Sequence, residues 1–89
     1  LEALSRSIAL EYGSKGIRCN VIQAGVCITP SFTMIPGHER LAQISLERNP
    51  MNRLTTPEDI AGVVHFLSTD DAKWINGAII PVDGGESIA

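Results

Sequence analysis

The chain has 89 residues, of which 44% are hydrophobic and 19% charged, a balance typical of one small globular domain and not of a disordered segment or a collagen-like repeat. Its 7 basic and 10 acidic residues give a net charge of −3, the wrong sign for general attraction to nucleic acid or to anionic lipid. Its apolar runs are far shorter than the ~20 residues that span a bilayer, so we expect no membrane partner.

The cysteines and histidines do not form a metal-binding pattern. Cys19 and Cys27 belong to no Cys-x-x-Cys pair and have no histidine at zinc-finger spacing. We therefore expect free thiols, no metal site and a reducing compartment such as the cytoplasm. His38 and His65 lack a second ligand at a site-forming spacing, which indicates surface or lightly buried histidines.

The first predicted element is an amphipathic helix over residues 1–12. Its apolar residues recur at steps of three or four, at Leu1, Leu4, Ile8 and Tyr12. We expect it to end at Gly13 in a left-handed conformation. No capping residue precedes Leu1, so the leading amides would lack partners, and we expect the chain to be a segment of a longer protein.

A strand and a long irregular region follow. Residues 17–24 mix β-branched and small residues between glycines, which predicts a strand and, with the preceding helix, the second half of a βαβ unit. Residues 25–50 contain several Pro and Gly breakers and one expected helix, residues 39–48, with Leu41 and Ile44 directed inward.

The best-marked helix begins after Thr56, which is expected to be its N-cap, with Pro57 in the first helical position. Its apolar stripe comprises Ile60, Val63, Val64 and Leu67. Asp70 and Asp71 predict a turn. Residues 78–82 predict a short edge strand, because Pro81 cannot donate to a ladder, and no helix is expected after Gly84 and Gly85.

This order predicts an α/β fold of doubly wound character. Parallel strands need crossover helices, and helices alternate with strands along the chain. Two strands cannot cover helices on both faces, so we expect the apolar stripes to stay exposed.

Five motifs cover almost the whole chain: residues 1–11 (LEALSRSIALE), 16–21 (GIRCNV), 25–29 (GVCIT), 55–61 (TTPEDIA) and 76–85 (NGAIIPVDGG). In this order they resemble the C-terminal third of a short-chain dehydrogenase/reductase, closest to the 3-oxoacyl and enoyl carrier-protein reductases of fatty-acid synthesis. The resemblance implies that the chain is the C-terminal portion of a doubly wound Rossmann-type parallel sheet, a segment of a single domain whose N-terminal part lies upstream.

The resemblance also implies that the turn after the first strand binds the nicotinamide half of NAD or NADP. By match to the motif, Ala24 and Gly25 begin this turn, the Cys27 backbone holds the carboxamide, and the Thr29 hydroxyl bonds the carboxamide or a phosphate. A carboxamide needs one donor and one acceptor, and strand-end backbone beside a glycine can offer both. Ala24 replaces the family's usual proline and Cys27 its usual isoleucine. Without the resemblance, an ordinary strand-to-loop turn is the alternative.

Residues 30–50 would then form a substrate lid, since ligands of doubly wound folds bind beyond the carboxyl ends of the strands. Phe32, Met34 and Ile35 are candidates to line an apolar or acyl-thioester substrate, with packing of the loop onto the body as the alternative. Three arginines form either a solvated surface or a contact for an acidic carrier protein, namely Arg40, Arg48 and Arg53.

No catalytic residue is assigned within the chain. The family's catalytic Tyr, Lys and Ser would lie upstream, and Tyr12 with Lys15 is spaced by three residues instead of four and interrupted by glycine. The Gly-rich dinucleotide fingerprint is also absent, and Gly84 and Gly85 do not replace it.

The leading hypothesis is an NAD(P)(H)-dependent oxidoreductase that transfers hydride to or from a carbonyl, alcohol or enoyl substrate. This chain would supply the nicotinamide turn, the lid and, through an exposed edge at Ile79 and Ile80, an interface of a homodimer or homotetramer. The alternatives are a non-catalytic assembly module of the same fold and a nucleotide-binding domain without redox chemistry. The substrate, the direction of reaction and the choice between NAD and NADP stay open, because the residues that select the cofactor follow another strand.

Overall fold

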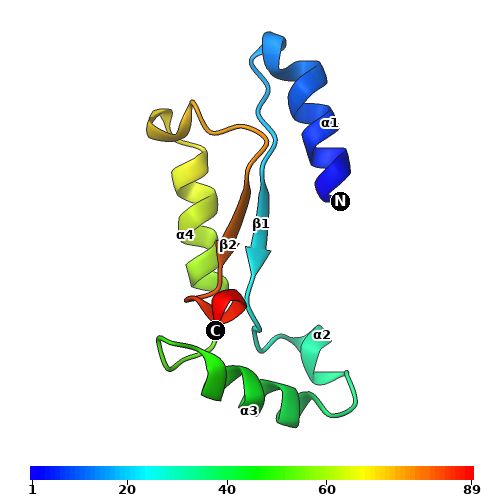
Figure 1. The fold of residues 1–89 in the computed structure, drawn as a ribbon, viewed down its shortest axis with the longest axis vertical. Coiled ribbons are helices and arrows are strands. Elements are labelled where there is room, and N and C mark those ends of the chain that lie inside the picture. Colours follow the sequence, from blue (N-terminus) through cyan, green and yellow to red (C-terminus); the bar gives the residue numbers. More distant parts are fainter.

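The computed structural model describes residues 1–89 as an elongated α/β unit of 45 × 24 × 23 Å (Figure 1). Four α-helices and two strands follow in chain order: α1 (Glu2–Tyr12), β1 (Val21–Ala24), α2 (Pro30–Thr33), α3 (His38–Arg48), α4 (Pro57–Leu67) and β2 (Ile79–Val82). Three single-turn 3-10 helices complete it: η1 (Gly13–Lys15), η2 (Asp70–Ala72) and η3 (Glu86–Ile88). The predicted order of helix, strand, irregular region, helix and strand is confirmed.

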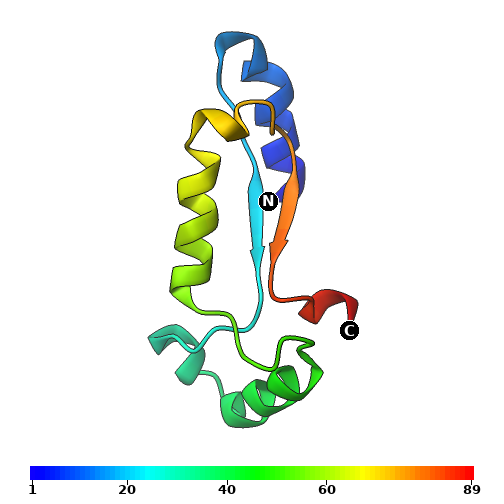
Figure 2. The same ribbon diagram turned by 90° about the vertical axis from the view of Figure 1, so that its left-hand side faces the viewer.

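β1 and β2 pair in parallel, with Pro81 opposite Gln23. α1 and α4 lie on opposite sides of the strands, whereas α2 and α3 lie beyond their carboxyl ends (Figure 1, Figure 2). This is the doubly wound arrangement, and it places the long connection after β1 at the sheet end where ligands of such folds bind. β2 pairs with β1 alone, so it is an edge strand as predicted, and the side chains of Ile79 and Ile80 are half-buried.

Side chains and a backbone bond together fix the approach to β1, where the Gly77 amide donates to the Cys19 carbonyl (2.9 Å). The Asn20 carboxamide accepts a hydrogen bond from the Ala78 amide (3.0 Å) and donates one to the Ile75 carbonyl (3.1 Å). Arg18 donates to the same carbonyl (3.2 Å) and to the Leu67 carbonyl at the end of α4 (2.7 Å). A cation at a helix C-terminus also interacts favourably with the helix dipole. β1 therefore starts later than predicted, because the preceding residues bond the opposite loop through their side chains.

The end of α1 and the segment after β2 differ from the prediction. Gly13 is right-handed (φ −57°) and opens η1, and the left-handed residue is Gly16 (φ 80°), because one more turn follows before the chain reverses. At the other end, Gly84 (φ 63°) and Gly85 (φ 92°) lead into η3, where no helix was expected. The amides of Gly85 and Ser87 donate to the Asp83 carboxylate, and these bonds hold the turn at the start of η3, as described below.

The apolar core is small. Ala9 and Ala72 are the only buried apolar residues, while Trp74 is 95% exposed. Leu41 and Ile44 of α3 are also exposed, which corrects the expectation that they point inward. Two strands offer too little surface to cover helices on both sides, so part of each apolar stripe is exposed as predicted, at Leu1 and Leu4 of the first and at Val64 of the second, whereas Ile60, Val63 and Leu67 are half-buried.

Candidate functional site

The turn at the carboxyl end of β1, here the strand-end turn (residues 24–29), is fixed from three directions. The Gly25 amide donates to the Val82 carbonyl of β2 (3.2 Å). The Val26 carbonyl accepts from the Thr55 amide (3.1 Å), just before α4. The Val26 amide donates to the Glu86 carboxylate of η3 (3.3 Å). Three elements that are distant from the turn in sequence therefore hold two of its adjacent residues, Gly25 and Val26.

Gly25 is needed for packing within the chain. A Cβ at this position would collide with Thr55 Oγ1 and would lie 2.9 Å from Asp83 Cβ and 3.1 Å from Asp83 Cα. Real Cβ contacts are not that short, so glycine alone fits. The sequence predicted that a ligand approaches Gly25 closely. On the side where a Cβ would stand, the close neighbours are instead Thr55 and Asp83, which are both buried.

Cys27 presents the free backbone groups that the sequence analysis required. Its N–H and its C=O form no hydrogen bond within the chain, and the residue is half-buried. Because a peptide unit is planar and trans, the Cys27 N–H points away from the Val26 carbonyl, and the bond from Thr55 to that carbonyl sets its direction. A free donor and a free acceptor on one residue fit a planar carboxamide, such as that of nicotinamide.

Thr29 closes the strand-end turn and starts α2. Its Oγ1 accepts a hydrogen bond from the Phe32 amide (3.1 Å), which makes Thr29 the N-cap of α2 with Pro30 in the first helical position. Its hydroxyl proton remains available to a ligand. At the other end of the turn, the Ala24 side chain is exposed, and its backbone belongs to β1.

The three predicted substrate residues do not converge. Met34 is 83% exposed and Ile35 is also exposed, along a shallow hollow in the connection between α2 and α3. Phe32 instead packs edge-on against the His38 ring, with 6.0 Å between centroids. This chain alone therefore brings none of them into a pocket with the strand-end turn.

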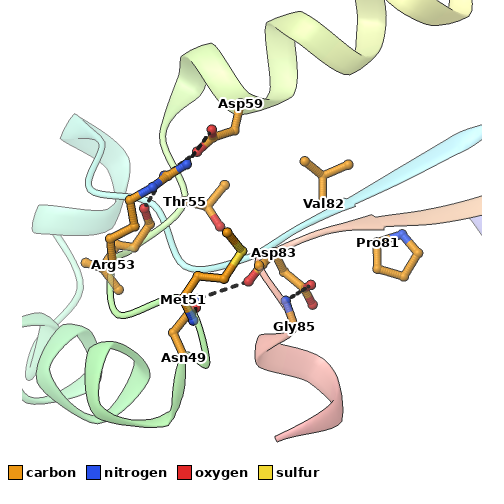
Figure 3. Close-up of a pocket in the computed structure, with 11 residues that line it drawn as sticks. Asn49, Met51, Arg53, Thr55, Asp59, Pro81, Val82, Asp83 and Gly85 are labelled. Carbon is orange, nitrogen blue, oxygen red and sulfur yellow. Dashed lines mark hydrogen bonds and ion pairs between the residues drawn. The ribbon is translucent and has the colours of Figure 1, made fainter.

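A pocket of about 330 Å³ lies beside the strand-end turn, between the α3–α4 connection and the end of β2 (Figure 3). Asn49 donates to the Asp83 carbonyl (2.9 Å) and accepts from the Met51 amide (2.8 Å), and Arg53 forms an ion pair with Asp59. These polar groups bond within the chain, Asn49 to Asp83 and Arg53 to Asp59, so the pocket lies at a junction that joins the α3–α4 connection to the end of β2 and to α4. Neither Cys27 nor Thr29 lines it.

The sequence analysis assigned no role to four residues around the strand-end turn: Asn49, Thr55, Asp83 and Glu86. Thr55 and Asp83 belong to motifs that were quoted for the resemblance, and this was their only signal. Hydrogen bonds from Ser87 and from the Gly85 amide hold the pKa of Asp83 below its ordinary value. Asn49 and Glu86 gave no signal, since their roles depend on contacts across 34 and 60 residues of sequence.

Arg53 has a defined partner within the chain, although its side chain is 56% exposed. It lies before α4 and donates to both carboxylate oxygens of Asp59, at 2.7 and 2.9 Å. Thr56 adds its backbone amide (2.8 Å) and hydroxyl (2.9 Å) to the same carboxylate, and its side chain caps α4 as predicted. The bonds from Arg53, followed by those from Thr56, hold the pKa of Asp59 far below its ordinary value.

We expect this carboxylate to make stability depend on acid pH. A lowered pKa in the folded state means that the unfolded chain binds the proton more tightly, so the stabilisation is fully present above pH ~4 and is lost as the pH falls toward the pKa of the folded state. Asp59→Asn should flatten the decline in unfolding free energy measured by urea denaturation below pH ~4 in the full-length protein. Glu58→Gln, in the same helical turn, should keep the decline. Equal slopes for wild type and Asp59→Asn would contradict this assignment.

Tyr12 and Lys15 do not form a catalytic pair at this site. The Lys15 ammonium lies 5.5 Å from the centre of the Tyr12 ring, a cation–π contact at the end of α1. That end of α1 lies at the opposite end of the molecule from the carboxyl ends of the strands (Figure 1). No three His, Cys, Asp or Glu side chains gather as metal ligands, and none of the helices combines the length and apolarity needed to cross a membrane.

Comparisons with known proteins give consistent matches along the chain. Residues 1–87 match the family described as Enoyl-(Acyl carrier protein) reductase. The 3-oxoacyl-[acyl-carrier-protein] reductase MabA of Mycobacterium bovis is 42% identical over 82 residues, covering 92% of this chain and 32% of that protein.

Two solved structures share the fold. An enoyl-[acyl-carrier-protein] reductase (NADH) from Aquifex aeolicus superposes with a TM-score of 0.92 at 32% identity, covering 100% of this chain and 34% of that one. An oxidoreductase of the short chain dehydrogenase/reductase family from Burkholderia thailandensis gives a TM-score of 0.86 at 34% identity, covering 99% and 35%. The chain thus spans about a third of the length of the relatives it matches.

Proposed function

The chain belongs to the short-chain dehydrogenase/reductase family, and on that basis we propose that it is the nicotinamide-binding C-terminal part of an NAD(P)(H)-dependent oxidoreductase. The observation that carries the proposal is the strand-end turn, in which Cys27 keeps both backbone groups free at the carboxyl end of the parallel sheet. When bound, the cofactor supplies or accepts a hydride. The substrate is a carbonyl, alcohol or enoyl compound, with acyl thioesters as the class to test first, because relatives named as acyl-carrier-protein reductases are among the matches.

In this proposal, the residues of this chain bind and orient the nicotinamide cofactor. The Cys27 N–H donates to the carboxamide oxygen and the Cys27 C=O accepts from the carboxamide nitrogen, which fixes the plane of the nicotinamide. The Thr29 hydroxyl donates to the carboxamide or to a phosphate. Residues 30–50 form the lid that excludes water, with Phe32, Met34 and Ile35 facing substrate once the upstream part of the protein is in place. That upstream part supplies the catalytic Tyr, Lys and Ser, and the assembled protein is a cytoplasmic homodimer or homotetramer.

Titration of the full-length protein with NADH and NADPH in a calorimeter tests the proposal. We expect saturable binding of at least one, followed by oxidation of that cofactor at 340 nm when an acetoacetyl or a crotonyl thioester is added. Consumption of only the first would assign 3-oxoacyl reduction, and of only the second, enoyl reduction. Failure to bind either cofactor would overturn the proposal and favour a non-catalytic assembly module of the same fold, whereas binding without turnover of any carbonyl substrate would favour a nucleotide-binding domain.

Removing the Thr29 hydroxyl should weaken cofactor binding. Thr29→Val deletes both the cap of α2 and the donor proposed for the cofactor, and loss of about one hydrogen bond corresponds to a roughly tenfold higher Kd for NAD(P)H. Thr29→Ser keeps both and should stay within about twofold of wild type. Thr33→Val is the matched control, since the Thr33 hydroxyl only donates to the Pro30 carbonyl within the same helical turn (2.9 Å). An unchanged Kd for Thr29→Val would remove Thr29 from the site.

A further inference from the structure

We propose that Glu86 is a positioning residue for the nicotinamide cofactor, acting through the Val26 amide; this inference rests on the proposed function of the strand-end turn. Glu86 Oε2 accepts a hydrogen bond from the Val26 N–H at 3.3 Å across 60 residues of sequence. The next residue is Cys27, whose free N–H and C=O hold the carboxamide in the proposed function. The C-terminal η3 therefore contacts the strand-end turn one residue before the cofactor-binding groups.

Both peptide units of Val26 are held by side chains or backbone from other segments. Glu86 fixes the unit that contains the Val26 N–H, and Thr55 fixes the unit that contains the Val26 C=O and the Cys27 N–H. If only the bond from Thr55 were present, the backbone could still rotate about the two single bonds of Val26. That rotation would also move the Cys27 carbonyl. With both bonds, the donor and the acceptor of Cys27 are preorganised, and binding loses less conformational entropy.

The backbone around Glu86 is itself held by Asp83. The buried Asp83 carboxylate accepts hydrogen bonds from the Gly85 and Ser87 amides, both at 3.0 Å, and the Asp83 carbonyl accepts from the Glu86 amide (3.2 Å). These bonds close the single turn of η3 around Glu86. Because Asp83 directly follows β2, the position of Glu86 is tied to the same sheet that carries the strand-end turn.

Only one oxygen of the Glu86 carboxylate is used within the chain. Oε1 is buried and has no hydrogen-bond partner. An unpartnered buried carboxylate oxygen is costly, and the bond to Val26 requires only one acceptor. A neutral amide can supply that acceptor, so glutamine at this position should preserve the contact while alanine removes it.

The test measures cofactor binding to the full-length protein with Glu86→Ala, Glu86→Gln and the control Ile88→Ala, which truncates an 88% exposed side chain in the same turn of η3. The probes are the reduced cofactor preferred by the wild type and ADP-ribose, or its 2′-phosphate if NADPH is preferred. ADP-ribose shares the adenosine diphosphate half of the cofactor and lacks nicotinamide, so a general loss of folded protein weakens both ligands equally.

For Glu86→Ala we expect a roughly tenfold higher Kd for the reduced cofactor and an unchanged Kd for ADP-ribose, with Glu86→Gln and Ile88→Ala both near wild type. In turnover, Glu86→Ala should raise KM for the cofactor far more than it lowers kcat. Equal weakening of both ligands would reduce Glu86 to a purely structural residue, and an unchanged Kd for the reduced cofactor would overturn the inference. If the wild type binds no reduced cofactor, the proposed function fails before Glu86 is tested.

Discussion

Replacing Gly25 with alanine is expected to abolish NAD(P)H binding by the full-length protein. The new Cβ would overlap Thr55 Oγ1 and press on the backbone of Asp83, and both residues are buried and held by other contacts. Relief requires β1 to move away from the segment before α4 and from the end of β2. That movement breaks the bonds that join Gly25 to Val82 and Val26 to Thr55. Overpacking of this kind costs about 1–3 kcal/mol or more, and here it acts directly on the turn that holds Cys27.

Calorimetric titration measures the loss of cofactor affinity, and a urea denaturation curve measures the loss of stability. The double variant Gly25→Ala/Thr55→Ala removes one of the two colliding groups and should recover part of the stability lost in the single variant, since contacting sites are not additive. Gly62→Ala is the control, because a Cβ there meets nothing within 4 Å and alanine favours a helix. Wild-type affinity in Gly25→Ala would show that the strand-end turn does not bind the cofactor in the proposed way.

Replacing Asn20 with alanine is expected to give the second large effect, on stability. One carboxamide joins the start of β1 to the loop before β2, with its oxygen bound to the Ala78 amide and its nitrogen bound to the Ile75 carbonyl. Alanine leaves the amide without an acceptor at the point where the two strands begin to pair. Loss of a half-buried partner of this kind costs about 1–3 kcal/mol, so the urea midpoint of the full-length protein should fall clearly.

Two further variants separate the effect of losing the carboxamide's hydrogen bonds from the effect of losing its volume. Asn20→Asp keeps the size and one acceptor but sets a carboxylate against the Ile75 carbonyl, so it should recover little of the loss. Gln43→Ala removes another carboxamide, one that bonds only Glu47 on the same exposed face of α3, and should lower the unfolding free energy by at most a few tenths of a kcal/mol, with little shift of the midpoint. A midpoint for Asn20→Ala equal to that of Gln43→Ala would contradict the role given to Asn20.

The helix starts show how much local sequence can specify. Thr56, Pro57 and Asp59 stand next to one another in sequence, and together they satisfy the first amides of α4 without help from any distant residue, apart from the added ion pair to Arg53. The start of α4 was therefore predictable. The end of α1 and the start of β1 were not, because Gly16 rather than Gly13 takes the left-handed conformation and because the side chains of Arg18 and Asn20 bond the opposite loop before β1 begins.

The candidate site divides in the same way. Gly25, Cys27 and Thr29 could be proposed from the sequence because they lie in one contiguous motif. Why glycine and threonine occur at these positions could not be predicted. Thr55 and Asp83 fill the space beside Gly25, and the Thr29 hydroxyl caps α2. The proposed substrate residues Phe32, Met34 and Ile35 stay a prediction, because the structure leaves Met34 and Ile35 exposed and brings none of the three into a pocket with the strand-end turn.

By itself, the sequence determined the family, the doubly wound order of elements, the start of α4 and the place of the strand-end turn, because each depends on periodicity, capping or a motif within a few neighbouring residues. Only the tertiary structure decided why the strand-end turn is rigid. Thr55, Val82 and Glu86 bond it from elements that are all distant from the turn in sequence, and a contact across 29 to 60 residues leaves no local pattern in the chain. Such contacts exist only after β1 and β2 have paired in parallel and brought their carboxyl ends to one edge of the sheet.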